Sequence, residues 1–362
     1  MHKNWDCQVA TYGDGELIDL LDKIGVKTTI LPLPANYHNS ALVKIFKKTI
    51  KIFYNIINIF KLISLCRDKN VATVYVNTVA KLSPVLAGKI ANKTVIVHVR
   101  EGTNYLNSKN LIRKTSLYIM IRLTDEFICI SNSNRKMLES LEYTSVPINV
   151  IPNGINISEF RRNAEYNNLI REKYNIPKET TLIGFIGSLS YRKGIDIFLK
   201  AATELCKSNS YYFLVVGGEK HQIEKYKASI SENPWIEDKI KFVGFKKDVR
   251  PYFSAMNIFA LTSRDEPFGR VNLEAACMGC TIVATRVGGI PEILTDKENA
   301  LLIPPNSVSA LIESVEYLSK NPEFAELLRI NAKKTVEENF SIETCNHKIE
   351  KILENRLLKQ PE

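Results

Sequence analysis

Two glutamates, Glu266 and Glu274, stand eight positions apart in the run EPFGRVNLE, which is the strongest chemical signal in the sequence. The run follows an apolar stretch that ends near Leu261, and it opens a predicted helix at residues 271–278. Carboxylates accept hydrogen bonds from hydroxyl groups, a helix N-terminus attracts an anion, and Gly269 lets a ligand approach the backbone. The run predicts a site for a ligand with hydroxyl groups and negative charge, although two glutamates alone also fit a solvated helix start.

A second run, GSLSYRKG, begins at Gly187 and carries the cations Arg192 and Lys193. It follows a predicted strand at 182–186 and precedes a predicted helix at 195–206. A strand, a glycine loop, a cation pair and a helix start in this order favour a bound phosphate, because backbone amides, the helix dipole and fixed cations converge there. The run lacks the Walker spacing, and the alternative is an ordinary turn with exposed cations.

A third run, VGGIPE at residues 287–292, follows a predicted strand at 281–284. Its paired glycines, Gly288 and Gly289, again permit close approach to the backbone. Taken alone, the run also fits a tight loop between a strand and a helix.

Short apolar runs alternate with longer amphipathic stretches along almost the whole chain. This alternation is typical of βαβ units around a parallel sheet. The pattern restarts near Leu182, after the polar stretch 161–181. The predicted strands are 7–10, 28–31, 73–76, 94–99, 127–130, 149–151, 182–186, 212–216, 240–242, 258–261 and 281–284.

The turn residues Pro152-Asn153-Gly154 mark a hinge between two halves of this pattern. We therefore predict an α/β protein with two doubly wound, Rossmann-like domains, residues 1–152 and 153–342. A C-terminal helix at about 343–362 is expected to pack back on the first domain.

Positive charge is concentrated in the first part of the 362-residue chain. Residues 1–150 contain 20 lysines and arginines against 11 acidic residues, a net +9 of the total +10. This balance predicts an anionic partner, such as a membrane surface, a phosphate-bearing substrate or a nucleic acid. No zinc, RNA-recognition or helix-turn-helix pattern supports a nucleic acid, so we expect none.

The cysteine pattern fits a reducing cytosol best. The seven cysteines are scattered and odd in number, so we expect no disulfide framework. The first residues contain no signal-peptide core, and no run of about 18 apolar residues predicts a membrane span. Cys277-x-x-Cys280 has no second cysteine pair, and Asp-x-Asp is absent, so we expect neither a metal ion nor another cofactor.

A predicted helix at 41–67 combines many isoleucines and phenylalanines with Lys44, Lys47, Lys48 and Lys51. Their spacing puts most of these lysines on one helical face. One interpretation is a buried packing helix with a solvated basic end. The other is a surface helix that lies on anionic lipid.

Several of these runs together resemble the nucleotide-sugar half of glycosyltransferase family four. They are IGSLSYRKG, VGF at 243–245, and SRDEPFGRVNLEAACMGCTIVATRVGGIPEIL. IPNGIN at 151–156 is similar to the domain junction of this family, and ISNS at 130–133 to the strand end before it. The resemblance covers about residues 5–345. It implies the GT-B fold, in which two Rossmann-like domains face a cleft, and sugar transfer from a nucleotide diphosphate sugar with retention at the anomeric carbon.

The resemblance also implies roles for single residues. Glu266 contacts hydroxyl groups of the donor sugar near the anomeric centre, Glu274 binds the ribose hydroxyls, and Lys193 neutralises the diphosphate. Ser188 stands where the family often has arginine, and Arg192 is the candidate to supply that charge. The remaining donor-binding candidates are Gly187, Phe268, Gly269, Arg270 and Val271.

A strand-end histidine of the N-terminal domain usually faces the donor sugar in this family. The matching run here is VHVREG at 97–102. Alternation puts His98 and Arg100 on the same side of the strand. Register favours Arg100 and residue type favours His98, so both are catalytic candidates, while a lone strand histidine also fits a core position.

The expected function is a retaining glycosyltransferase that acts on a glycan or lipid-linked acceptor in cell-surface polysaccharide synthesis. Without Asp-x-Asp, Lys193 and helix N-termini would stabilise the leaving diphosphate in place of a metal ion. The expected location is the cytoplasm, or the inner face of the cytoplasmic membrane. The alternatives are a catalytically weak nucleotide-sugar-binding subunit and another GT-B enzyme, such as a nucleotide-sugar epimerase.

The resemblance finally implies a strand, a glycine loop and a helix before anything like WDCQVATYGDGELIDLLDKIGVKTTILPLP. Only five residues precede Asp6. We therefore expect the N-terminal domain to lack its first βα unit. An upstream start codon and a truncated, weakly active form are the two explanations.

Overall fold

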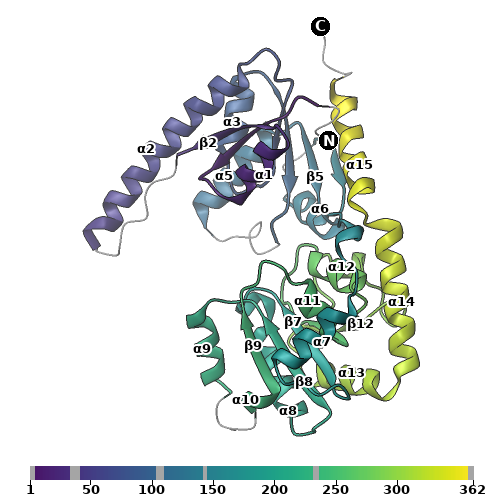
Figure 1. Ribbon diagram of the computed structural model, residues 1–362. Helices are drawn as coiled ribbons and strands as arrows, with labels where there is room; N and C mark the ends of the chain where they lie inside the picture. The colour runs from purple at the N-terminus through teal and green to yellow at the C-terminus, as the bar shows by residue number, and fades with distance from the viewer. Residues whose placement is uncertain (1–4, 33–40, 103–109, 142–144, 231–235, 358–362) are drawn as a thin grey trace.

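The computed structural model describes residues 5–32, 41–102, 110–141, 145–230 and 236–357, and Figure 1 shows two α/β lobes. The strands of the N-terminal lobe are β1 (Gln8–Tyr12), β2 (Lys27–Leu31), β3 (Thr73–Val76), β4 (Thr94–Val99), β5 (Glu126–Cys129) and β6 (Ile148–Val150). Its helices are α1 (Glu16–Lys23), α2 (Ala41–Cys66), α3 (Ser83–Ile90), α5 (Leu111–Leu123) and α6 (Asn132–Glu139).

The strands of the C-terminal lobe are β7 (Thr181–Ile186), β8 (Tyr211–Val216), β9 (Ile240–Gly244), β10 (Ile258–Leu261), β11 (Thr281–Thr285) and β12 (Leu301–Ile303). Its helices are α7 (Ala164–Lys173), α8 (Ile195–Leu205), α9 (Lys220–Ala228), α10 (Ile236–Lys239), α11 (Arg250–Ala255), α12 (Arg270–Cys277), α13 (Val308–Lys320) and α14 (Pro322–Asn339). Single 3-10 turns are η2 (Ile157–Glu159), η3 (Tyr191–Lys193) and η4 (Ile290–Glu292). Helix α15 (Ile342–Leu357) then returns to the N-terminal lobe (Figure 1).

One parallel sheet with the order β12-β11-β10-β7-β8-β9 forms the C-terminal lobe. Strands such as β8 (YYFLVV) consist of β-branched, aromatic and other apolar residues, as expected where helices cover both faces. The chain runs outward from β7 on one side and from β10 on the other, so the order reverses between these two strands. Ligands of such sheets bind at the carboxyl ends of the strands beside this switch point.

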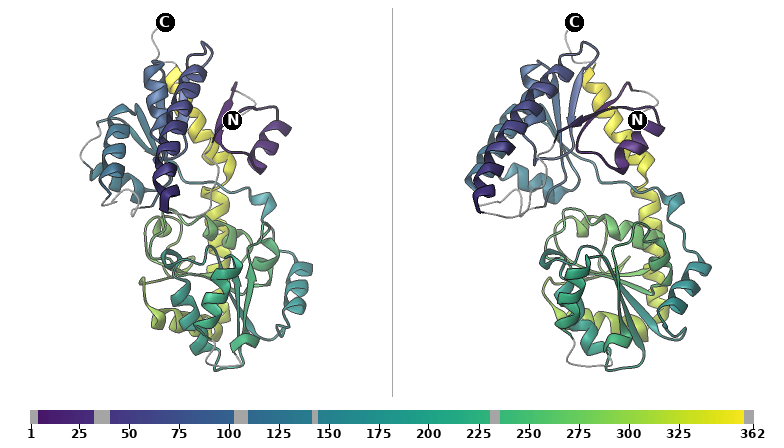
Figure 2. Two further views of the ribbon diagram at one scale, coloured as in Figure 1. Left: turned by 90° about the vertical axis from the view of Figure 1, so that its left-hand side faces the viewer. Right: turned by 60° about the vertical axis from the view of Figure 1, so that its left-hand side comes forward.

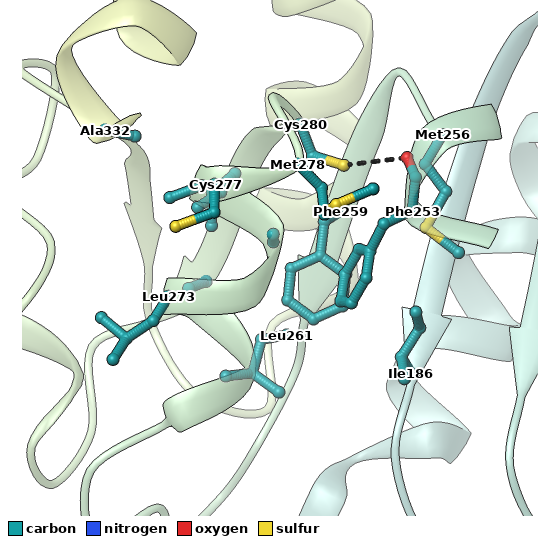
Figure 3. Packing of buried hydrophobic residues seen from close by; sticks show 14 of the residues in the cluster. Ile186, Phe253, Met256, Phe259, Leu261, Leu273, Cys277, Met278, Cys280 and Ala332 are labelled. Atoms are coloured by element: carbon teal, nitrogen blue, oxygen red, sulfur yellow. Dashed lines mark hydrogen bonds between the residues drawn. The ribbon is translucent and has the colours of Figure 1, made fainter. Parts of the chain in front are cut away.

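Two hydrophobic clusters cover the faces of this sheet. One contains Phe253 and Cys280, whose thiol donates to the Phe253 carbonyl at 3.4 Å (Figure 3). The other contains Phe185, Phe198 and Phe213 from β7, α8 and β8. Burial of each such side chain stabilises the fold by about 1.5–3 kcal/mol, so the carboxyl edge of the sheet is a rigid platform.

Among the described residues, the N-terminal lobe contains two separate parallel sheets, β3-β4-β5-β6 and β1-β2. The Tyr12 and Ser83 hydroxyls lie 2.8 Å apart, and the Asn58 side chain donates to the Pro32 carbonyl. These contacts hold the carboxyl end of the smaller sheet on α2 and near α3. Helices α2, α3 and α5 lie on one side of the larger sheet and α15 on the other (Figures 1 and 2).

Helix α15 joins the two lobes, because α14 and α15 run along both of them (Figure 2). Its apolar residues pack against the larger N-terminal sheet, at Ile96, Ile128 and Ile151. The residues of α15 that do so are Cys345, Ile349 and Leu353. No helix within the described ranges combines the length and the apolar character needed to cross a membrane.

The predicted α/β class with two Rossmann-like units of parallel strands is confirmed, and among the described strands only the C-terminal sheet shows the reversal of order that defines double winding. Strand β12 and helix α7, which lies in the stretch interpreted as a polar connection, were not predicted. Strand β12 has three residues and α7 buries only Ile170 and Arg171, so neither carries a strong periodic pattern. The predicted absence of a first βα unit concerns residues before Met1 and stays a prediction.

Candidate active site

Three loops meet at the carboxyl edge of the C-terminal sheet. The first runs from β7 through η3 to α8, the second from β10 to α12, and the third from β11 through η4. They are the three runs singled out in the sequence. Because β7, β10 and β11 are neighbours in one ladder, these distant parts of the chain lie side by side at the switch point.

Lys193 and Glu266 form an ion pair between the first two loops, with the ammonium donating to Oε2 of the carboxylate. The Ser263 hydroxyl donates to the same oxygen at 3.4 Å. The two charged side chains are only 16% and 9% exposed. Removing one partner from such a shielded pair leaves an uncompensated charge, so each side chain needs an equivalent partner when it leaves the other.

The first two loops interlock, and this fixes the pair. Gly194 has a φ of 68°, and a Cβ there would lie 1.9 Å from the Thr262 carbonyl, so only glycine fits. Arg264 donates to both carboxylate oxygens of Asp196 at 2.7 Å and lies 3.7 Å from the centre of the Tyr191 ring. The hydrogen bond from Arg264 lowers the pKa of Asp196, which therefore stays ionised and holds the second loop on α8.

The third loop packs on the backbone of the second. Gly288 has a φ of 53°, and a Cβ there would lie 2.0 Å from the Glu266 carbonyl oxygen. The Gly289 N–H donates to this carbonyl at 3.0 Å, and the Thr285 hydroxyl donates to the Ser263 carbonyl at 2.6 Å. The paired glycines therefore serve an approach within the protein, which holds Glu266 in place.

Glu274 lies on α12, one turn beyond the helix start. Gly269, with a φ of 88°, precedes the helix, and Val271 packs half-buried against the core. Arg270 Nε lies 3.4 Å from Glu274 Oε1. Burial raises the pKa of Glu274, and the Arg270 charge opposes this effect. The adjacent Asn272 is fully buried, and its side-chain amide has no partner among the described residues.

The other predicted donor-site residues hold the loops. Arg192 donates to the Asp265 carbonyl at 2.9 Å, which ties its guanidinium to the second loop. The Gly187 N–H donates to a carbonyl at the end of β8. Phe268 is buried against Phe340, with ring centroids 6.0 Å apart. A ligand could therefore meet the backbone of Phe268, but not its side chain.

His98 lies near the end of β4 and Arg100 follows the strand, and Arg100 Nη2 is 3.4 Å from His98 Nδ1. The Tyr75 hydroxyl on β3 also bonds His98 Nδ1. Arg100 donates further to the side-chain oxygens of Asn77 at 2.6 Å and Asn153 at 2.7 Å. Since Asn153 belongs to the hinge between the lobes, Arg100 is held by both strand and hinge.

His98 is a neutral imidazole with its proton on Nε2. Burial, and then the Arg100 charge, lower the pKa of His98 to about 3, and burial raises the pKa of Tyr75 to about 12. Arginine can only donate, so Nδ1 is the acceptor and Nε2 carries the hydrogen. Nε2 is buried and has no partner within the described part of the chain. His98 therefore holds one unused hydrogen-bond donor.

The loop after β4 lies against the loop after β10. A Cβ on Gly102 would lie 2.6 Å from Asp265 Oδ2 and 3.3 Å from the Pro267 ring. Burial lowers the pKa of Arg100, and Arg270 of the other lobe is close enough to lower it further. The structure thus brings the predicted residues Arg100 and Arg270 to facing edges of the two lobes.

Sequence reasoning missed several residues of this arrangement. Tyr75 and Asn77 stand on and after β3, Asn153 stood in the hinge motif without a role, and Arg264 and Asp196 brace the first two loops. Asn153 and Arg264 stand within the runs IPNGIN and SRDEPFG, but neither run indicates which residues they contact. Their partners lie 53 and 68 positions away and depend on the tertiary fold.

Two further features lie apart from these loops. Cys277 and Cys280 are buried in the core, where burial raises the pKa of each thiol to about 12. Across the described ranges, no three His, Cys, Asp or Glu side chains gather as a metal site would require. A cavity of about 540 Å³ lies between α8 and α9 beside Leu199, Tyr226 and Ile230. None of the predicted donor-site residues lines it, so we place the candidate site at the switch point.

Two Rossmann-like lobes with a polar site at their facing edges are the architecture of GT-B glycosyltransferases. The fold is similar to a crystal structure of HepE from Anabaena in complex with UDP and glucose. The TM-score is 0.80 at 21% identity, and the match covers 96% of this chain and 91% of HepE.

Residues 6–159 match the family model Glycosyltransferase Family 4, and residues 167–335 match the model Glycosyl transferases group 1. The chain belongs to this glycosyltransferase family, and the predicted resemblance is confirmed.

Individual relatives match less of the chain. An uncharacterized glycosyltransferase of Methanocaldococcus jannaschii is 27% identical over 198 residues, which are 54% of this chain and 50% of the relative. The chain thus spans about half the length of this relative. The capsular polysaccharide biosynthesis glycosyltransferase CapM of Staphylococcus aureus is 24% identical over 331 residues, 87% of this chain and 85% of CapM.

Proposed function

We propose that the chain transfers a sugar from a nucleotide diphosphate sugar to a glycan or lipid-linked acceptor, with retention at the anomeric carbon. The observation that carries this proposal is the Lys193–Glu266 pair at the switch point, with Glu274 on the following helix. A structure of HepE in complex with UDP-glucose supports a nucleotide-sugar donor, and the relative CapM supports a role in polysaccharide synthesis.

In the donor complex, the diphosphate replaces Glu266 as the partner of Lys193. The released carboxylate accepts hydrogen bonds from sugar hydroxyls near the anomeric carbon, and Glu274 accepts those of the ribose. The N-terminus of α12, after Gly269, adds partial positive charge beside the phosphates. Lys193 therefore keeps an anionic partner, and the Glu266 carboxylate keeps hydrogen-bond donors, when the donor binds.

The diphosphate gains negative charge as its bond to the sugar breaks, and Lys193 and Arg270 stabilise this charge. A phosphate oxygen then takes the proton of the acceptor hydroxyl, which attacks from the same face and so retains the configuration. His98 does not accept this proton near neutral pH, because its pKa is about 3. Instead, His98 Nε2–H and the Arg100 guanidinium of the N-terminal lobe donate hydrogen bonds to the bound donor. The chain thus contributes position and charge.

The transfer is proposed to need no divalent metal ion. Lys193 stands at the switch point, and Arg270 and Arg100 lie at the facing edges of the two lobes. These three cations supply the positive charge that a metal ion gives in other diphosphate sites. Activity that disappears with EDTA and returns with Mg²⁺ or Mn²⁺ would contradict this part.

The N-terminal lobe is further proposed to lie on an anionic membrane surface, close to a lipid-linked acceptor. Helices α2 and α5 contain eight lysines and arginines and no acidic residue. Phe53 and Phe60 on α2 and Leu111 and Ile112 on α5 are exposed, Phe60 by 68% and Leu111 by 76%. Both helices pack on α3, on one side of the larger sheet (Figure 2). Cations and exposed apolar side chains on one side fit a peripheral lipid contact.

A panel of nucleotide sugars tests the proposed transfer. The full chain is incubated with each donor in EDTA, and slow release of free nucleotide identifies the donor. NMR of the product formed with that donor then gives the anomeric configuration, which we expect to be retained. An inverted product would contradict the mechanism. Donor binding without any release, both in EDTA and with added Mg²⁺ or Mn²⁺, would favour the nucleotide-sugar-binding subunit.

A further inference from the structure

A carboxylate of the C-terminal lobe reaches the first turn of a helix in the N-terminal lobe. Glu292, at the end of η4, accepts hydrogen bonds from the backbone N–H of Asn132 at 2.7 Å and of Ser133 at 2.9 Å. It also accepts one from the Asn132 side chain at 3.1 Å. Figure 1 shows this helix, α6, at the edge of its lobe that faces α12. Residues 160 positions apart thus join the two lobes.

The contact completes the N-terminus of α6. The first N–H groups of a helix have no partner within the helix. The hydroxyl of Ser131, the N-cap, accepts from the Asn134 N–H at 3.1 Å. Glu292 accepts from the N–H groups of Asn132 and Ser133, which precede Asn134 in the helix. Its negative charge lies at the positive end of the helix dipole. One carboxylate therefore supplies hydrogen bonds and a charge interaction across the lobe boundary.

The same residue is joined directly to the donor loops. Glu292 follows Gly289, whose N–H donates to the Glu266 carbonyl at 3.0 Å. A Cβ on Gly289 would lie 2.4 Å from the Pro267 carbonyl and 3.0 Å from the Ser131 side chain. The third loop is thus pressed between the start of α6 and the backbone that carries Glu266. A rotation of the lobes away from each other must break the Glu292 contact.

We infer that Glu292 is a positioning residue that holds the two lobes closed and thereby keeps the N-terminal residues His98 and Arg100 over the donor site. The Glu16–Lys247 ion pair, whose side chains are 73% and 79% exposed, also crosses between the lobes. Exposed pairs contribute little, so it cannot replace the Glu292 contact. The geometric part of this inference is independent of the donor, and its kinetic part rests on the proposed function.

Two variants remove the contact from opposite sides. Glu292→Gln removes the charge and one acceptor oxygen. Asn132→Pro removes two of the three donors, and proline is well accepted at the first position of a helix after an extended residue such as Ser131. Glu298→Gln, on an exposed carboxylate of the same lobe, is the matched control. Circular dichroism and thermal unfolding establish that each full chain is folded.

Small-angle scattering and hydrogen exchange measure the lobe arrangement without any donor. We expect a larger radius of gyration for both variants, and exchange about tenfold faster at the start of α6, because hydrogen bonds to a charged group are lost. The double variant should differ little from either single variant, since both break one contact. Glu298→Gln should behave as wild type.

Kinetics then separate closure from donor binding. With the accepted nucleotide sugar, Glu292→Gln should lower kcat by about tenfold and leave the Kd of the nucleoside diphosphate unchanged, because the lobes no longer align. Unchanged scattering in both variants would overturn the inference, even if exchange at α6 rises, because the carboxylate would then be a local helix cap only. Failure of donor turnover in the wild type would instead count against the proposed function.

Discussion

The two lobes differ in how completely their strands join into one sheet and in how many buried polar side chains are hydrogen-bonded. The C-terminal lobe joins six strands in one ladder, and its three site loops are bound to one another by hydrogen bonds and close glycine contacts. In the N-terminal lobe, β1-β2 and β3-β6 are separate sheets among the described residues. The buried side-chain atoms without a partner follow the same division, because in the described ranges they belong to Trp5, Asn58, Thr73 and His98 of the N-terminal lobe and to Asn272 of the other.

This difference fits a separate proposed role for each lobe. A closed sheet holds Lys193, Glu266 and Glu274 in fixed positions, as recognition of a charged, hydroxyl-rich donor requires. The N-terminal lobe keeps basic charge, exposed apolar residues on α2 and α5, and an unused His98 donor. We therefore expect substitutions in the C-terminal lobe to act on donor binding and turnover. Substitutions in the N-terminal lobe should leave nucleotide binding intact and should act on turnover, on membrane contact and on stability.

The largest effect should follow from Lys193→Ala. Loss of the cation that compensates the leaving diphosphate is expected to lower kcat by about 10²–10³-fold and to raise the donor KM. Steady-state kinetics with the accepted nucleotide sugar provide the measurement. Lys200→Ala, on the exposed side of α8, is the control and should keep wild-type rates. Wild-type kinetics in Lys193→Ala would remove this residue from the donor site.

Glu274→Ala should weaken nucleoside diphosphate binding by about 1.5–3 kcal/mol, roughly 10–150-fold, because a charged acceptor of hydrogen bonds is lost. Calorimetric titration measures this change. Burial raises the pKa of Glu274, so wild-type affinity should fall with decreasing pH already above the usual carboxyl range.

Glu266→Ala should instead reduce turnover more than nucleoside diphosphate binding. Equal losses of both in Glu266→Ala would mean that Glu266 is structural.

In the N-terminal lobe, Phe53→Ser combined with Phe60→Ser should reduce binding to vesicles of phosphatidylglycerol and phosphatidylcholine by about tenfold, because two apolar side chains no longer leave water. Added salt should weaken the remaining binding, since each basic group near the surface contributes about 1 kcal/mol. Leu327→Ser with Ile330→Ser, two exposed residues on α14, is the matched control. Equal sedimentation of the wild type with purely neutral vesicles would contradict an anionic contact.

His98 should make the stability of the chain depend on pH. Its folded-state pKa of about 3 lies below the ordinary value of 6.5, so between these values only the unfolded chain binds the proton. The free energy of unfolding should therefore decrease as the pH falls below about 6.5, by up to about 1.4 kcal/mol per pH unit. Urea unfolding at several pH values measures this slope. It should be smaller in His98→Gln and unchanged in His347→Gln, whose histidine is exposed on α15.

Much of the C-terminal lobe could be predicted because its strands are continuous apolar runs, each followed by a distinctive loop. The predicted strand 182–186 agrees with β7, and the predicted helix 271–278 agrees with α12. The Lys193–Glu266 pair could not be predicted, because it depends on β7 and β10 being neighbours in the ladder. The paired glycines Gly288 and Gly289 were predicted to permit close approach to the backbone or to form a tight loop, and the groups that approach them are the backbone of Glu266 and Phe268.

In the N-terminal lobe, the side of β4 could be predicted for His98 and Arg100, but their contacts could not. Alternation predicted that His98 and Arg100 share one side of β4, and they do. Their partners Tyr75, Asn77 and Asn153 come from a neighbouring strand and from the hinge, which no local pattern indicates. Glu292 stood in a recognised run, but its contact with α6 exists only when the two lobes are assembled.

The central claim is that the switch point of the C-terminal lobe binds the nucleotide part of a sugar donor. Calorimetric titration of the full chain with UDP, GDP and ADP tests it most directly, with Lys193→Ala, Glu274→Ala and His98→Gln measured beside the wild type. We expect at least one nucleotide to bind the wild type, both C-terminal variants to lose most of this affinity, and His98→Gln to retain it. Binding that persists in Lys193→Ala and Glu274→Ala, or no binding to the wild type, would contradict a nucleotide site at the switch point.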